Sequence, residues 1–305
     1  MDLGSNSVHL LVAAIVGHRL ESLADESAFL GLGSAVAARG FLGRAARTEL
    51  SETLSRYADT ARSLGAANVT FLGTEPIRRA ADGAAIVRDA HEAARAPLHV
   101  LSHEEEAYLT IIGVTEGIPV TDETLVVDVG GGSSEFCIVD AVHRPRAAGL
   151  RVGSARLTDR FVSHDPPIAP EVESMRLAAA EAIVPAPDAA PIDLIAVGGT
   201  ASNLVKMLPE AVADRILTRD RIAAIQALLA TQLASATAAR YGINPVRARL
   251  LPAGGAVIEA ILARYDADAI RVSDAGLREG VILAVRHAGP SWRDRLPDLA
   301  HGWRT

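Results

Sequence analysis

The hydrophobic and polar residues of this chain follow the spacings of strands and amphipathic helices. The apolar run 8–16 and the segment 20–27 flank the turn Gly17-His18-Arg19 and predict a hairpin. Residues 44–64 have helical spacing and end beside Gly65, a common helix terminator. Further strands are expected at 69–72, 98–101, 125–127, 136–139, 146–150, 192–197 and 269–273, and further helices at 84–94, 171–183, 219–240 and 245–264, with others starting near 102, 154 and 200. Strands that alternate with helices in this way predict an α/β fold.

Composition limits the class of protein. A chain of 305 residues is long enough for two domains. Although 49% of its residues are hydrophobic, no apolar run approaches the roughly 18 residues that a membrane span needs. The first residues include Asp2 and no basic residue, which disfavours a signal peptide. The single cysteine, Cys137, excludes an internal disulfide and favours the reducing cytoplasm. The net charge of −7 disfavours nucleic acid as a partner.

The stretch DVGGGSSEF, residues 128–136, is the main chemical motif. It follows the apolar run 125–127, and three successive glycines allow a tight turn that exposes backbone N–H groups. Such a turn suits phosphate, and the flanking Asp128 and Glu135 could hold a divalent cation. A purely structural turn is the alternative interpretation.

A second copy of this pattern favours the phosphate interpretation. DLGSNS, residues 2–7, has the same order of acid, glycine and serine as DVGGGS, residues 128–133, and each copy precedes an apolar run. The repeat predicts a duplicated architecture, with an N-terminal domain at 1–120 and a C-terminal domain at 121–305. A third candidate anion loop, Gly198-Gly199-Thr200, lies between an expected strand and a helix.

Three acids, Glu104 to Glu106, follow Ser102, which is a candidate helix N-cap. Acids in a first helical turn often only compensate the helix dipole, and we expect this to explain two of the three. His99 and His103 are separated by a strand-to-loop junction, which disfavours a metal site. The pair His164-Asp165 lies beside Pro166 and is interpreted as a turn.

Six motifs in order, DLGSNS, GTEPIR, EEEA, DVGGGSSE, VGGT and SDAGLREG, resemble those of the exopolyphosphatase/guanosine pentaphosphate phosphohydrolase (Ppx/GppA) family. The resemblance covers about residues 2 to 287. It implies duplicated ribonuclease-H-like domains of the actin-like ATPase superfamily, with mixed sheets flanked by helices and an active site in the cleft between domains. It also implies an exopolyphosphatase-type hydrolase of phosphoanhydrides that uses Mg²⁺ or another divalent cation, and a homodimer.

The resemblance assigns roles by position. Glu106 and Glu135 would be the catalytic carboxylates, and Asp128, Asp2 and Glu135 would lie near the metal. The phosphate-binding residues would be Ser5, Asn6, Ser7, Arg78, Gly130, Gly131, Gly132, Ser133, Gly198, Gly199 and Thr200.

The chain departs from the family pattern at both ends. Only Met1 precedes Asp2, where the family has a complete strand, so we expect a translation start upstream or an impaired product. No appended helical HD-type domain is expected after the second domain, and the last helix could pack back on the first domain. We therefore favour short polyphosphate as substrate, with guanosine pentaphosphate as the alternative. A small-molecule kinase of the same superfamily and a non-catalytic nucleotide- or alarmone-binding protein are rival interpretations.

Overall fold

The computed structural model describes residues 1–17 and 19–304, so His18 of the expected hairpin turn lies outside the described residues. The chain divides into two compact units, Met1–Glu106 and Ala107–Thr305. The division falls within helix α5 (His103–Thr115), whereas the sequence suggested a boundary at 120/121. Each unit is described separately.

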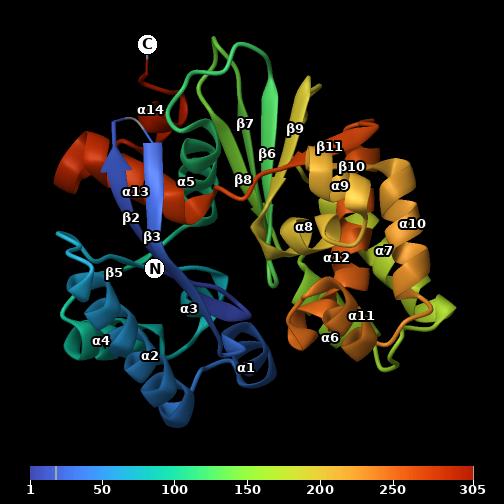
Figure 1. The fold of residues 1–305 in the computed structure, drawn as a ribbon, viewed down its shortest axis with the longest axis horizontal. Coiled ribbons are helices and arrows are strands. Elements are labelled where there is room, and N and C mark those ends of the chain that lie inside the picture. Colours follow the sequence, from blue (N-terminus) through green and yellow to red (C-terminus); the bar gives the residue numbers. More distant parts are fainter. Residues whose placement is uncertain (18, 305) are drawn as a thin grey trace. The chain divides into compact units, whose positions relative to one another are not determined.

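The first unit is a mixed sheet covered by helices (Figure 1). Its elements are β1 (Asp2–Leu3), β2 (Ser7–Val16), β3 (Arg19–Phe29), α1 (Leu32–Arg39), α2 (Arg44–Ser63), β4 (Phe71–Gly73), α3 (Glu75–Arg79), α4 (Gly83–Ala94), β5 (Leu98–Val100) and the start of α5. Among the described residues the strand order is β3-β2-β1-β4-β5. Leu3, Leu54, Tyr57 and Phe71 are fully or almost fully buried in its core.

Strand β1 occupies the centre of this sheet although it has only two residues. It pairs antiparallel with β2 and parallel with β4. The chain is paired up to its first residue, since the Met1 ammonium donates to the Thr70 carbonyl at 2.8 Å and Leu72 N donates to the Met1 carbonyl at 2.9 Å. The backbone groups of this short strand are therefore satisfied by its neighbours.

The second unit contains a larger sheet with helices on both sides (Figure 1). Its elements are the remainder of α5, β6 (Thr124–Val129), β7 (Ser134–Val139), β8 (Arg146–Leu150), α6 (Ser154–Phe161), α7 (Ala169–Ile183), β9 (Asp193–Val197), α8 (Gly198–Val205), α9 (Pro209–Asp214), β10 (Ile216–Thr218), α10 (Arg219–Leu229), α11 (Ala234–Tyr241), α12 (Pro245–Arg264), β11 (Ala269–Val272), α13 (Leu277–Ala288), a 3₁₀ turn (Gly289–Ser291) and α14 (Leu296–Ala300). Its strand order over the described residues is β10-β11-β9-β6-β7-β8.

The two sheets share one topology, which confirms the predicted duplicated α/β fold. In each, the first three strands form an antiparallel meander. A fourth strand pairs in parallel with the other side of the first strand, and one further strand pairs in parallel with the fourth. Strands β1, β2, β3, β4 and β5 thus correspond to β6, β7, β8, β9 and β11. Strand β10 is an addition at the edge of the second sheet, where it pairs antiparallel with β11.

Glycines allow two helices of the second unit to touch through their backbones. A Cβ atom at Gly280 in α13 would lie 1.8 Å from the Leu109 carbonyl oxygen of α5. A Cβ atom at Gly113 in α5 would lie 2.0 Å from the Gly276 carbonyl oxygen. No side chain larger than hydrogen fits at either position, so this pair of glycines fixes the distance between α5 and α13.

The predicted single helix at 219–240 is wrong. The structure has two helices there, because α10 ends at Leu229 and α11 starts at Ala234. The Thr231 hydroxyl donates to the Leu228 carbonyl at 3.0 Å, and Asp165 accepts from the Ala234 N–H at 2.9 Å. A side chain 69 residues away thus starts the second helix, which no local pattern could indicate.

Other differences are smaller. Helix α1 was not among the expected helices, and Gly31 and Gly40 lie at its two ends in left-handed conformations. No described helix is long and apolar enough to cross a membrane.

Candidate functional site

The two repeated motifs fold into the same closed loop. In the first unit the Gly4 N–H donates to the Ser7 carbonyl at 3.1 Å, and in the second the Gly130 N–H donates to the Ser133 carbonyl, also at 3.1 Å. Each loop connects the first and second strands of its sheet. The sequence repeat is therefore also a structural repeat, in which the same backbone hydrogen bond closes each loop.

The N-terminus of α6 holds the glycine loop of the second unit in place. The Ser154 and Arg156 N–H groups each donate at 3.0 Å, to the Gly130 and Gly131 carbonyls respectively. Arg156 Nε donates to the Gly132 carbonyl at 2.8 Å. Because the loop carbonyls are bound on the α6 side, the geometry of the loop is fixed before any ligand arrives.

Asp128 and Glu135 lie directly opposite each other on adjacent strands. They are partners in the antiparallel register of β6 and β7, so their side chains are on the same face of the sheet. Two like charges in this arrangement repel each other. A Cβ atom at Gly198, whose φ is +90°, would lie 2.5 Å from Asp128 Oδ1, so glycine is required there both by conformation and by space.

The equivalent position in the first unit carries a different side chain. The register of β1 and β2 pairs Asp2 with His9, which therefore corresponds to Glu135. His9 Nε2 lies 2.8 Å from the Ser7 hydroxyl. The first unit thus has the loop but not the pair of opposed carboxylates.

The other predicted residues of the first loop are held by nearby groups. Ser5 Oγ donates to Glu75 Oε2 at 3.4 Å, and Glu75 also accepts from Arg79 Nη1 at 2.7 Å. The Asn6 carbonyl accepts from the N–H groups of Leu30 and Gly31 at 3.1 and 3.0 Å. Glu75 is only 2% exposed, and no role was predicted for it.

The predicted loop Gly198-Gly199-Thr200 forms the first turn of α8. Asn203 donates to the Gly199 carbonyl at 2.6 Å, and Thr200 Oγ1 donates to Ser154 Oγ at 3.4 Å, which connects this turn to α6. A Cβ atom at Gly199 would lie 1.7 Å from Nη1 of Arg247, so the Arg247 guanidinium covers this glycine. The sequence did not predict this contact, because Arg247 belongs to α12 and no motif connects it to the loop.

The three acids at the start of α5 are in three different environments. Glu105 and Ser102 form a capping box: Ser102 N donates to Glu105 Oε2 at 2.7 Å, and Glu105 N donates to Ser102 Oγ at 3.2 Å. Glu104 is exposed, and hydrogen bonds from its own N–H and from the Ser102 hydroxyl lower its pKa. Glu106 is 6% exposed. Glu104 and Glu105 therefore stabilise the N-terminus of α5, as expected for two of the three acids. Glu106 does not take part in the capping box.

Glu106 is paired with Arg78. Arg78 Nη1 lies 2.5 Å from Glu106 Oε1 and also donates to the Leu101 carbonyl. Its other arm, Nη2, lies 3.0 Å from Nδ1 and 3.1 Å from Nε2 of His103. The structure of the first unit thus brings the predicted arginine and glutamate together and adds His103, which was not predicted to have a role.

The donor set of the second unit fits a divalent cation. Asp128 and Glu135 present two carboxylates on one face, beside a loop of backbone amides, and hard cations such as Mg²⁺ prefer oxygen ligands. A cation would also offset the repulsion between the two carboxylates. Asp2, the third predicted metal ligand, lies in the other unit, opposite a histidine.

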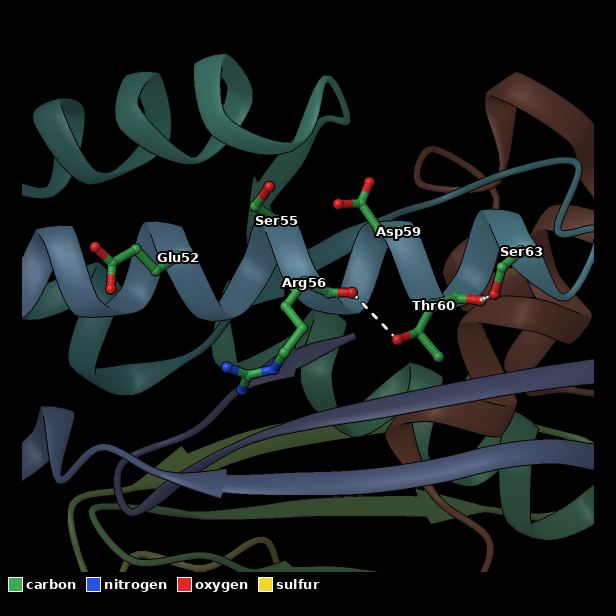
Figure 2. A pocket seen from close by; sticks show the side chains of 6 residues that line it. All are labelled: Glu52, Ser55, Arg56, Asp59, Thr60 and Ser63. Carbon is green, nitrogen blue, oxygen red and sulfur yellow. Dashed lines mark hydrogen bonds between the residues drawn. The ribbon is translucent and has the colours of Figure 1, made fainter.

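A separate polar hollow lies on the outer face of α2 (Figure 2). It is lined by Glu52, Ser55, Arg56, Asp59, Thr60 and Ser63. The Thr60 and Ser63 hydroxyls donate to carbonyls of their own helix, at 3.2 and 2.8 Å. None of the predicted site residues lines it, and mixed charges on an exposed helix face need no ligand to explain them.

Comparisons with known proteins agree with the motifs. The chain is 28% identical to exopolyphosphatase 1 of Mycobacterium leprae, over 93% of this chain and 87% of that protein. It is 25% identical to a guanosine-5'-triphosphate,3'-diphosphate pyrophosphatase of Vibrio parahaemolyticus, over 92% of this chain but only 58% of that protein.

Solved structures agree as well. A crystal structure of an exopolyphosphatase from Cytophaga hutchinsonii superposes with a TM-score of 0.83 and 26% identity, over 93% of this chain and 96% of that one. A Ppx/GppA family member from Aquifex aeolicus has the same fold, with a TM-score of 0.80 and 24% identity over 95% and 97% of the two chains. The sequence profile of the Ppx/GppA phosphatase family matches residues 11–288. The chain therefore belongs to the Ppx/GppA phosphatase family.

Proposed function

We propose that this protein is an exopolyphosphatase-type hydrolase that releases the terminal phosphate of short inorganic polyphosphate. Family membership supports phosphoanhydride hydrolysis. The observation that carries the proposal is the glycine loop 130–132, whose carbonyls are all bound by α6. A loop fixed in this way is prepared to bind the oxygens of a polyanion without a cost of reorganisation.

The proposed reaction needs a positioned water and stabilisation of negative charge. The water oxygen attacks the terminal phosphorus, the bond from that phosphorus to the bridging oxygen breaks, and the shortened chain leaves with the bridging oxygen. Glu106 and Glu135 are the proposed catalytic carboxylates that orient the water and accept its proton.

Phosphate-binding roles are proposed for the two closed loops, for Arg78 and for Gly198 to Thr200. Arg247 joins this group, because its guanidinium covers Gly199 and an arginine fork can donate two hydrogen bonds to one phosphate. Asp128, Glu135 and Asp2 are the proposed ligands of a divalent cation. Such an ion supplies charge neutralisation of the phosphate oxygens when bound.

The proposed catalytic role of Glu106 is tested by Glu106→Gln, which keeps the shape and removes the charge. General base catalysis is worth about 10²- to 10⁴-fold, so we expect a loss of that order in phosphate release from tripolyphosphate. Glu104→Gln is the matched control, since Glu104 is an exposed acid in the same helical turn, and it should retain wild-type turnover. Equal turnover of wild type and Glu106→Gln would refute the assignment.

The substrate is tested by comparing phosphate release from tripolyphosphate, long polyphosphate, guanosine pentaphosphate and ATP, with and without Mg²⁺. We expect the highest kcat/KM for short polyphosphate and loss of activity when EDTA removes the cation. Faster release from guanosine pentaphosphate would replace the proposed substrate with the alternative. Transfer from ATP to a small-molecule acceptor would indicate a kinase, and tight binding without release would indicate a binding protein.

A further inference from the structure

Arg78 is held by three groups of its own unit, and these groups differ in how strongly they bind a guanidinium. Nη1 donates to the Leu101 carbonyl and to the Glu106 carboxylate, whereas Nη2 faces His103. The contact to Glu106 is charge-assisted and stronger than a contact to neutral imidazole. The two arms of the arginine are therefore held unequally.

Nη2 lies over the face of the His103 ring. Its distances to the two ring nitrogens, 3.0 and 3.1 Å, are almost equal, whereas a donor on the in-plane lone pair of one nitrogen would be far from the other. The guanidinium therefore stacks on the imidazole, a contact that does not depend on the tautomer. His103 and Arg78 come from different elements, α5 and α3, so the contact fixes the end of a long and flexible side chain across two helices.

We propose that His103 is a positioning residue that holds the Nη2 arm of Arg78 ready for a phosphate oxygen of the substrate. This inference rests on the proposed function and on the proposed phosphate-binding role of Arg78. Nη1 stays bound to Glu106 and Leu101, while Nη2, stacked on the His103 ring, donates to an anionic oxygen. Substrate binding gains a charge-assisted hydrogen bond and leaves the orientation of Glu106 unchanged.

The role predicts an effect on binding and not on the chemical step. Without His103, the Nη2 end of the Arg78 side chain becomes ordered only when substrate binds. The conformational entropy lost in that step raises KM. A stacking contact between a guanidinium and an aromatic ring corresponds to a change of about 2- to 5-fold. We expect His103→Ala to raise KM for tripolyphosphate by that factor with kcat within about 2-fold of wild type. His103→Phe, which keeps an aromatic face beside the guanidinium, should restore most of the affinity.

The control and the coupling test use other residues of the same unit. His91→Ala is the matched control, since His91 is an exposed histidine at the end of α4 whose ring nitrogen contacts only its local Ala96 carbonyl at 3.3 Å among the hydrogen bonds described. It should leave KM and kcat unchanged. In an Arg78→Met background, His103→Ala should have no additional effect on KM, because the arm that it holds is gone.

Calorimetry then measures the affinity for tripolyphosphate in the absence of turnover. It compares Glu106→Gln with the double variant Glu106→Gln/His103→Ala. If wild type neither binds tripolyphosphate nor releases phosphate from it, the proposed function fails and this inference fails with it. If wild type is active and His103→Ala matches it in KM and in affinity, the inference alone is overturned. A fall in kcat at constant KM, or an unchanged effect of His103→Ala in the Arg78→Met background, would also overturn it.

Discussion

Gly280→Ala tests the backbone contact between α13 and α5. The new Cβ atom would lie 1.8 Å from the Leu109 carbonyl oxygen and 2.7 Å from its carbon. Because a carbon and an oxygen in close contact are roughly 3.3 Å apart, the helices must separate by more than about 1 Å. Both contact atoms belong to the backbone, so no rotamer change relieves the clash.

The size of the effect follows from two opposing contributions. Overpacking of this kind costs about 1–3 kcal/mol and sometimes more. Alanine in place of glycine inside a helix returns up to about 1 kcal/mol of helix propensity. Because the clash is with backbone atoms, the upper end of the overpacking cost applies and the expected net loss is about 2 kcal/mol. This loss corresponds to a fall in Tm of about 4–8 °C for a unit of this size.

Thermal unfolding followed by circular dichroism measures this change. Gly289→Ala is the control from the residue that follows α13: Gly289 has φ +59° but no atom within 4 Å of its Cβ position, so only its positive φ is penalised, by about 1–2 kcal/mol. Gly280→Ala should also lower kcat, because α5 carries Glu106 near its start, whereas Gly289→Ala should not. A Gly280→Ala protein that melts at or above the wild-type temperature would refute the predicted clash.

Three further outcomes are expected. Burial raises the pKa of the Cys137 thiol to about 12, so folded protein at pH 8 should not react with a disulfide reagent until denaturant is added, and rapid reaction of the folded protein would contradict this. The side chain of His164, followed by Ser163 and backbone donors, lowers the pKa of Glu171 to about 2. That contribution to stability is complete above the ordinary carboxyl pKa near 4.5 and is lost as the pH falls towards 2, so Glu171→Gln should flatten the dependence of Tm on pH in that range. Ser102→Ala removes the acceptor of the capping box at α5 and should cost about 1 kcal/mol, which urea unfolding would detect.

The sequence predicted those parts of the fold and site that depend on local patterns. The spacing of DLGSNS and DVGGGS predicted the repeated loop, and the alternation of strands and helices predicted the α/β class. The Ser102 N-cap was equally local, and the structure confirms it. Each of these features is decided by residues that lie within one turn or one strand.

The remaining features depend on contacts between distant residues. Arg247 covers Gly199 from 48 positions along the chain, and Asp165 starts α11 from another loop. His103 gains a role only because Arg78, 25 residues earlier, extends to it from another helix. Hydrophobic spacing does not predict these contacts, because it indicates which face of an element is buried and not which distant polar group binds there.

The two closed loops differ in the residue opposite the aspartate, His9 in one and Glu135 in the other. The hydrogen bond that closes each loop involves only backbone atoms, so this residue can change without altering the turn. The backbone of the loop and the charge beside it are therefore structurally independent of each other. In a protein of this architecture, a single substitution on the second strand is enough to create or remove an acid pair while the backbone stays as it was.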